Sequence, residues 1–102
     1  MDDGYEVIKT KEKEHVVVTV MGSDRIGIVA AVSNALSGCN ANIVDISQTI
    51  MQGIFAMILV VDISAAKCDL LGLEDILNKV GAELGVKIVV QHQDIFRYMH
   101  RI

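Results

Sequence analysis

The sequence predicts an α+β fold with the element order β-α-β-β-α-β. Short segments rich in β-branched residues alternate with two segments in which apolar residues recur at helical spacing. A Gln52-Gly53 pair separates the second and third strand-like segments, as a tight hairpin turn would. Two helical crossovers and one hairpin favour a four-stranded antiparallel sheet with both helices on one face, the ferredoxin-like sandwich.

The first strand is expected over residues 15–22, a valine-rich segment followed by a turn-like Gly-Ser-Asp sequence. The first helix is expected over residues 26–38, where apolar residues three and four positions apart predict one buried stripe. The stripe consists of Ile28, Val29, Val32, Ala35 and Leu36. We expect Ser23 or Asp24 to cap the start of this helix and Gly38 to end it.

The second strand is expected over residues 42–51, where alternation gives one apolar side and one mixed, wetter side. Residues 54–63 are apolar on both sides, which indicates an interior strand covered on both faces. The second helix is expected over residues 69–84, followed by Gly85 as its stop, and the last strand over residues 86–92. The apolar stripe of the second helix consists of Leu73, Ile76, Leu77, Val80 and Leu84.

The chain divides into three parts by charge. Residues 1–13 are a charged leader that we expect to be solvated, residues 14–93 form one domain, and residues 94–102 form a tail. In the tail, Ile95, Met99 and Ile102 follow an amphipathic helical spacing, so we expect a short helix that docks on its own domain or on a neighbouring subunit.

Composition excludes several classes of function. The 102 residues are 52% hydrophobic and 22% charged, too apolar for a disordered chain, and no apolar run is long enough for a membrane helix. A net charge of −4 without a dense basic cluster argues against nucleic-acid binding. The acidic opening lacks the apolar core of a secretory signal, so we expect a cytoplasmic protein without a membrane or nucleic-acid partner.

The cysteines and histidines carry no metal-binding spacing. Cys39 and Cys68 are far apart in the sequence and form no CxxC motif, so we expect reduced, partly buried thiols rather than a disulfide or a zinc site. The three histidines are scattered. We therefore expect no metal and no cofactor, and a heavy-metal chaperone on this fold is excluded because it would need a CxxC in the first loop.

The most informative segment is residues 22–29, where the first strand leads into the first helix. The free N–H groups of a helix start favour an anion, and Gly22 and Gly27 would let a ligand approach the backbone. Asp24 can cap the helix or accept a hydrogen bond from a ligand ammonium, and Arg25 can hold a carboxylate or pair with an acid. Local geometry alone favours an ordinary capped turn, in which Asp24 caps the helix and Arg25 is solvated.

Three stretches of the sequence carry a family resemblance. The stretches GSDRIGIV (22–29), GCNANI (38–43) and QHQDIFRYMHRI (91–102) resemble the ACT domain, a small-molecule-sensing module of amino-acid metabolism. The whole chain is most similar to the stand-alone ACT-domain proteins of the UPF0237 group, and the first loop also resembles that of the glycine-cleavage-system regulator. That loop usually carries proline where this chain has Ile26, which keeps its N–H and leaves the backbone less constrained.

The resemblance implies a ligand site between the first loop of one subunit and the start of the second strand, or the facing loop, of its neighbour. The first wall would consist of Ser23, Asp24, Arg25, Ile26, Gly27, Ile28 and Val29. The second wall would consist of Asn42, Ile43 and Val44. Asn42 carries both a donor and an acceptor that could read a ligand, although a turn residue before a strand is an equal alternative.

The resemblance implies a non-enzymatic regulatory protein that binds a small molecule, an amino acid above all. We also expect a homodimer or larger oligomer, because a sheet with apolar residues on both faces and helices on one leaves apolar area uncovered. One alternative is an acylphosphatase-like hydrolase on the same fold, in which Arg25 and Asn42 would take the catalytic roles. Another is a ligand-free oligomerisation module.

Overall fold

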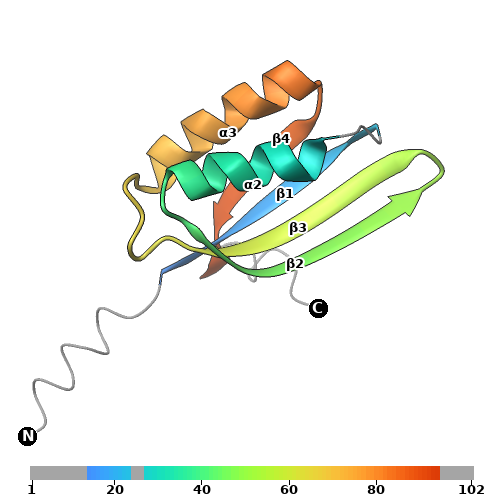
Figure 1. The fold of residues 1–102 in the computed structure, drawn as a ribbon. Coiled ribbons are helices and arrows are strands. Elements are labelled where there is room, and N and C mark those ends of the chain that lie inside the picture. Colours follow the sequence, from blue (N-terminus) through green and yellow to red (C-terminus); the bar gives the residue numbers. More distant parts are fainter. Residues whose placement is uncertain (1–13, 24–26, 95–102) are drawn as a thin grey trace, which may run out of the picture.

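The structure is a computed structural model, and it describes residues 14–23 and 27–94 (Figure 1). The leader 1–13, the loop residues 24–26 and the tail from residue 95 lie outside the described residues. In chain order the elements are β1 (His15–Ser23), α2 (Ile28–Gly38), β2 (Asn42–Met51), β3 (Ile54–Asp62), α3 (Leu70–Leu84) and β4 (Lys87–His92). None of the helices in these described ranges is long and apolar enough to cross a membrane.

The four strands form one antiparallel sheet in the order β2-β3-β1-β4, with both helices on one face (Figure 1). This arrangement confirms the ferredoxin-like fold. The central strands are β1 and β3, paired from His15–Asp62 at one end of the sheet to Ser23–Ile54 at the other. The prediction that the doubly apolar strand lies in the interior of the sheet is confirmed, because β3 pairs on both sides.

The core lies between the helices and one face of the sheet. Its side chains come from alternate positions of the strands and from one stripe of each helix. The fully buried large side chains are Val16, Val18 and Val20 of β1, Met57, Leu59 and Val61 of β3, Ile28, Val32 and Leu36 of α2, and Leu73 and Leu77 of α3. The prediction that Val29 belongs to the buried stripe of α2 is wrong, because its side chain lies on the exposed side of the helix.

Both predicted ends of α3 are confirmed. The Asp69 carboxylate accepts a hydrogen bond from the Gly72 N–H at 2.9 Å and caps the start of the helix. Gly85 has a left-handed backbone with φ 73°, and its N–H donates to the Gly81 carbonyl at 2.8 Å. Both caps are local features, because each rests on residues within four positions of the helix end.

The predicted start of α2 is wrong. The helix begins at Ile28, and its N-cap is Gly27, which has a left-handed backbone with φ 92° and no side-chain cap. Ser23, expected as a cap, is the last residue of β1 and pairs with Ile54. The physical reason is the long β2–β3 hairpin, which extends past the start of α2 and lengthens the pairing of β1 (Figure 1).

The predicted end of α2 at Gly38 is confirmed, but Gly38 is not the left-handed residue that closes the helix. Gly38 is the last helical residue, and the left-handed position is Asn40, with φ 59°. The Asn40 N–H donates to the Ser37 carbonyl, and the Ala41 N–H donates to the Leu36 carbonyl, both at 2.9 Å. This is the Schellman pattern, in which asparagine tolerates the left-handed position that glycine more often occupies.

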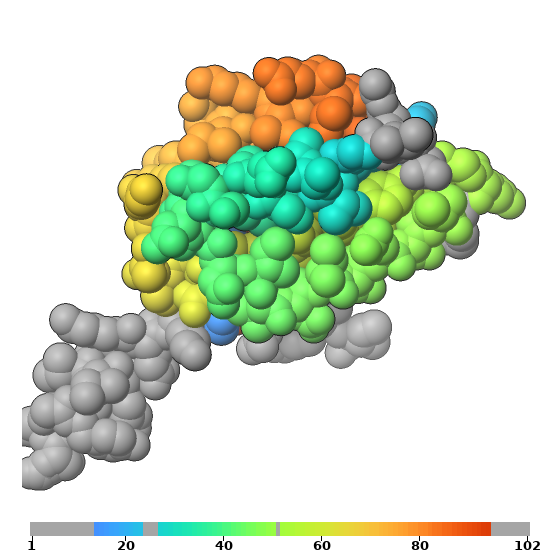
Figure 2. Space-filling model, viewed as in Figure 1, coloured from blue at the N-terminus to red at the C-terminus, as the bar shows by residue number. Residues whose placement is uncertain are grey.

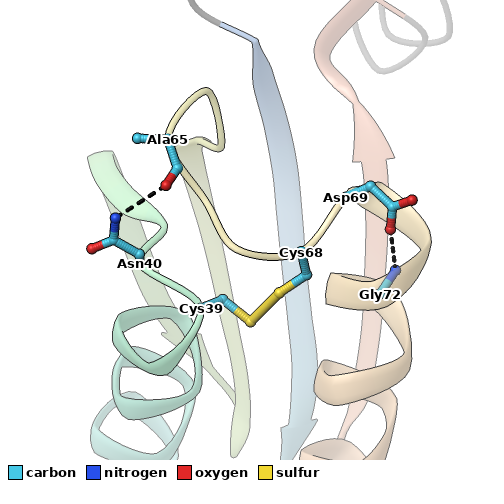
Figure 3. Close-up of a disulfide and its surroundings, with 6 residues drawn as sticks. All are labelled: Cys39, Asn40, Ala65, Cys68, Asp69 and Gly72. Carbon is cyan, nitrogen blue, oxygen red and sulfur yellow. Dashed lines mark hydrogen bonds between the residues drawn. A yellow bond between two sulfur atoms is a disulfide. The ribbon is translucent and has the colours of Figure 1, made fainter.

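The predicted reduced thiols are contradicted, because Cys39 and Cys68 form a disulfide (Figure 3). Their Cα atoms lie 6.1 Å apart, within the usual range for a disulfide, although 29 positions separate them in the sequence. The fold brings them together because β2 starts beside the end of β3, where Asn42 pairs with Asp62. The loops that precede β2 and follow β3 therefore meet at one end of the sheet.

Candidate functional site

The described part of the first predicted wall lies where β1 leads into α2. Ser23 ends β1, Gly27 caps α2, and Ile28 and Val29 form its first turn. The backbone N–H groups of a first helical turn have no partner within the helix, and no described side chain caps this one. An added Cβ on Gly27 would meet no heavy atom within 4 Å. Among the described residues, therefore, nothing blocks the approach of a ligand with hydrogen-bond acceptors to this end of α2.

Gly22 has a different role from the one the sequence suggested. An added Cβ would lie 2.7 Å from Cγ1 and 3.2 Å from Cα of Val86. The residue is therefore glycine because β1 passes close to the chain entering β4, not because a ligand needs access. Gly27 is the glycine of this segment that is both open and left-handed.

The second predicted wall lies at the opposite end of the sheet. Asn42 pairs with Asp62, which pairs with His15 at the start of β1, whereas the first wall begins at the other end of β1. The nine-residue β1 separates the two ends by about 26 Å at the usual rise of a strand. One chain alone therefore does not bring Asn42 and Gly27 into one site.

A surface cavity of about 350 Å³ lies beside the second wall. It is lined by Ser33, Leu36, Ser37, Asn40, Ala41, Asn42 and Ile43, from the last two turns of α2 through the start of β2. Figure 2 views the molecule from this side, with α2 and β2 as neighbouring bands. The lining offers hydroxyl and amide groups and no charged side chain, so it suits a polar ligand that needs both donors and acceptors.

Sequence analysis found Asn42 and Ile43 but missed Ser33, Ser37 and Asn40. Ser33 and Ser37 are one helical turn apart on a side of α2 that flanks its buried stripe. This spacing could have indicated a polar helix face, but not that the face borders a cavity.

Two hydrogen bonds and the disulfide join the cavity wall to the loop after β3. Figure 3 shows the disulfide and the hydrogen bond from Asn40 to Ala65. The Asn40 amide Nδ2 donates to the Ala65 carbonyl at 3.0 Å, and the Lys67 N–H donates to the Cys39 carbonyl at 2.8 Å. Cys39 itself is 4% exposed. The wall formed by residues 39–42 is therefore held at this end by one covalent and two polar links.

The outer edge of β2 has no partner strand among the described residues. The strand carries a bulge at Val44, where the register passes from Ile43–Val61 to Asp45–Val60. Val44 is 52% exposed and Ile46 is 39% exposed. An open strand with apolar side chains at its edge is a template for pairing with another strand.

The face of the sheet opposite the helices is also partly apolar and exposed. Its exposed large side chains are Met21 of β1, Ile54 and Ile58 of β3, and Val89 of β4. The structure therefore offers two surfaces on which a second copy could pack, namely the β2 edge and this open face.

The described residues contain little that resembles a catalytic group. His92 is half-buried between two exposed carboxylates, with Nε2 4.0 Å from Glu14 Oε2 and Nδ1 3.8 Å from Asp94 Oδ2, and no described nucleophile accompanies it. Within residues 14–23 and 27–94, no group of three or more His, Cys, Asp or Glu side chains is placed to hold a metal ion. Asn42 and Gly27 lie at opposite sheet ends, which does not favour a hydrolase site between loop and β2 in one chain.

Comparisons with known proteins agree with this geometry. A family model described as the ACT domain matches residues 14–91. A UPF0237 protein of Methanocaldococcus jannaschii is 62% identical over 87 residues, which cover 85% of this chain and 97% of that protein. An ACT domain protein from Streptococcus pneumoniae superposes with a TM-score of 0.73 at 39% identity, covering 83% of this chain and 96% of that one.

A protein assigned as a glycine cleavage system transcriptional repressor shares the fold, with a TM-score of 0.70 at 21% identity. The superposition covers 79% of this chain and 46% of that one.

Proposed function

The chain belongs to the ACT-domain family, in its UPF0237 group, and from this premise we propose that it is a non-enzymatic regulatory protein that binds a free amino acid as a homodimer. The observation that carries the proposal is the separation of the two predicted walls. They lie at opposite ends of one sheet, while the β2 edge between them has no partner among the described strands.

A two-fold symmetric dimer through the β2 edges brings the two walls together. Antiparallel pairing of two β2 strands sets Asn42 of one copy opposite the Met51 end of the other. Met51 pairs with Ile54, and Ile54 pairs with Ser23, so this is the sheet end from which the first wall starts. Each dimer then contains two equivalent sites, each with one wall from either copy.

The chemistry of the joined walls suits a zwitterion. The N–H groups of the first turn of α2 and the guanidinium of Arg25 receive the ligand carboxylate, and Asp24 receives the ammonium. Asn42 supplies a donor and an acceptor from the second copy. Ile28 and Ile43 provide apolar surface between these polar groups. A phosphate is a poorer ligand because Asp24 would repel it.

The remaining wall residues complete this site. In the first wall, Ser23 and Ile26 contribute backbone groups and Val29 contributes an exposed apolar side chain. In the second wall, Val44 contributes the bulged edge of β2. The cavity beside Asn42 extends the site along α2 through Ser33 and Ser37, where hydroxyl groups can hydrogen-bond to a polar ligand side chain.

In this proposal, ligand binding acts through the assembly state of the domain or on another protein. We place it in the cytoplasm, without a nucleic-acid or membrane partner and without a cofactor or metal. Its net charge of −4 disfavours contact with phosphate backbones and anionic lipid surfaces.

The dimer is tested by light scattering on two variants matched in exposure. Ile46 at the β2 edge and Ile58 on the open sheet face are each 39% exposed. Ile46→Asp should give a monomer, because it would bury a carboxylate where the two β2 strands meet, whereas Ile58→Asp should remain a dimer. A monomeric wild type, or dissociation by Ile58→Asp alone, would contradict the proposed edge pairing.

The ligand class is tested by a thermal-shift screen of the wild type against the twenty free amino acids. A ligand present at roughly 100 times its Kd should add about 2.7 kcal/mol of stability. The same ligand should bind Asp24→Ala and Gly27→Val more weakly, through loss of the ammonium contact and through a blocked backbone approach. Wild-type affinity in both variants would place the site elsewhere.

A further inference from the structure

The disulfide joins the two loops that meet at the cavity end of the sheet. Cys39 directly follows α2 and precedes Asn40, Ala41 and Asn42, three consecutive residues of the cavity wall. Cys68 lies in the loop after β3, next to the Asp69 cap of α3 (Figure 3). One covalent bond therefore links the wall of the cavity to the start of the second helix.

The other links between the two loops are weak by comparison. They are the hydrogen bonds from Asn40 to Ala65 and from Lys67 to Cys39. Asn40 and Ala65 are exposed residues, so water competes for the hydrogen bond between them. The conformation of this wall depends on the disulfide more than on either hydrogen bond.

The two sulfurs differ in accessibility. Cys39 is 4% exposed, whereas Cys68 is only half-buried and lies in a surface loop. A thiolate from solvent therefore has its approach at Cys68. A disulfide in a reducing compartment is usually transient and redox-sensing, and we have placed this protein in the cytoplasm.

We propose that the Cys39–Cys68 disulfide is a redox switch that controls the ligand affinity of the cavity wall formed by Asn40, Ala41 and Asn42. The proposal rests on the function proposed above, because Asn42 belongs to the second wall of that site. The oxidised form holds the wall ready for a ligand. The dithiol form must order the wall on binding and therefore binds the same ligand more weakly.

The chemical step is thiol–disulfide exchange with a dithiol reductant. A thiolate of the reductant attacks Cys68 Sγ, the bond to Cys39 Sγ breaks, and Cys39 leaves as a thiolate that takes up a proton. The second thiol of the reductant then attacks the mixed disulfide, releases Cys68 and closes the reductant's own disulfide. Two electrons and two protons pass from the reductant to the two cysteines, and oxidation reverses the step.

The first experiment needs no ligand. Amide hydrogen exchange is compared between the oxidised full-length protein and the same protein reduced with dithiothreitol, with Cys68→Ser as a variant that cannot form the bond. We expect the amides of Asn40, Ala41 and Asn42 to exchange about tenfold faster after reduction. This increase should exceed the increase at core amides such as that of Leu59. Cys68→Ser should match the reduced wild type and should not respond to dithiothreitol.

Two results would overturn the switch. One is equal exchange at the cavity wall in the oxidised and reduced forms, which would make the disulfide a simple brace. The other is a dithiothreitol effect that persists in Cys68→Ser, which would assign the effect to something other than this bond.

The second experiment repeats the screen of free amino acids on both redox forms. We expect the amino acid that stabilises the oxidised protein to bind the reduced protein about tenfold more weakly. Binding and reduction are linked reciprocally. A saturating concentration of that amino acid should therefore change, by the same factor, the ratio of reduced to oxidised dithiothreitol at which half of the protein is reduced. Equal affinity of the amino acid for both redox forms overturns the switch. Absence of binding to either form overturns the proposed ligand class, and the hydrogen-exchange experiment then decides whether the cavity wall responds to reduction.

Discussion

The two ends of the sheet are built in different ways. At one end, a disulfide, two loop-to-loop hydrogen bonds and the Asp69 cap hold the loops and the start of α3. At the other end, α2 starts at Gly27 without a side-chain cap, and the β2–β3 hairpin extends beyond the helices (Figure 1). Links that hold a loop also use up its polar groups. At the open end, no described side chain caps the N–H groups of the first turn of α2.

This contrast matters because the proposed site takes one wall from each kind of end. The wall from the closed end is shaped before a ligand arrives, whereas the wall from the open end offers its N–H groups. A pre-shaped wall lowers the entropy cost of binding, and unsatisfied donors supply the interaction. The following substitutions test whether the two ends differ in this way.

The largest expected effect is the loss of the covalent link at the closed end. Cys68→Ser opens a loop with a sequence separation of 29 residues. Loop-closure entropy then predicts a loss of about 3 to 4 kcal/mol in the free energy of unfolding. Urea unfolding under oxidising conditions measures this loss, and the reduced wild type is the matched control. A loss below about 1 kcal/mol would mean that the two hydrogen bonds suffice to hold this end.

An intermediate effect is expected from the two glycines at the open end. Gly22→Ala should lower the free energy of unfolding by about 1 to 3 kcal/mol, because its Cβ would contact Val86 at 2.7 Å. Gly27→Ala should cost about 1 kcal/mol through its φ of 92°, since no atom stands in its way. Thermal unfolding of both variants measures the difference.

A double-mutant cycle identifies the cause of the Gly22 effect. In a Val86→Ala background the clash at Cγ1 is absent, so Gly22→Ala should cost clearly less there. Gly27→Ala should cost the same in both backgrounds. An unchanged cost of Gly22→Ala would mean that the clash with the Val86 side chain is not the cause.

The smallest effects are expected at the two helix starts. Asp69→Ala removes a cap and should cost about 1 kcal/mol, whereas Asp69→Asn should cost only a few tenths because asparagine caps equally well. Gly27→Asn should also cost less than about 1 kcal/mol, because asparagine tolerates the left-handed backbone. Chemical denaturation measures all three. Equal losses for Asp69→Ala and Asp69→Asn would show that the hydrogen bond to Gly72 contributes little.

Much of the fold followed from the sequence because its signals are local. The stripe of α3 and its stop at Gly85 depend on residues a few positions apart, and both predictions are confirmed. The interior position of β3 followed from apolar residues on both of its sides. The order of the elements then left few topologies, because antiparallel hairpins and right-handed crossovers restrict how six elements can pack.

The errors share one cause, which is that contacts between distant segments decided the outcome. Ser23 extends β1 because it pairs with Ile54, 31 positions later in the sequence. Therefore α2 starts later than its own sequence suggests. Gly22 is needed because Val86 lies against it. For the site, the family motif indicated residues of both walls, but their separation by the full length of β1 follows only from the sheet register.

The sequence by itself determined the element types, the helix and strand periodicities and the stop of α3 at Gly85, since these rest on local propensity, and the family motif indicated candidate ligand-binding residues. Only the tertiary structure decided that Cys39 and Cys68 meet, that Asn40 and the serines of α2 border a cavity, and that the two walls require a second copy in the proposed site. The physical reason is that antiparallel pairing of β2 with β3 places the start of one strand beside the end of the other. Two loops far apart in the sequence thereby become neighbours, and no spacing along the chain reveals this.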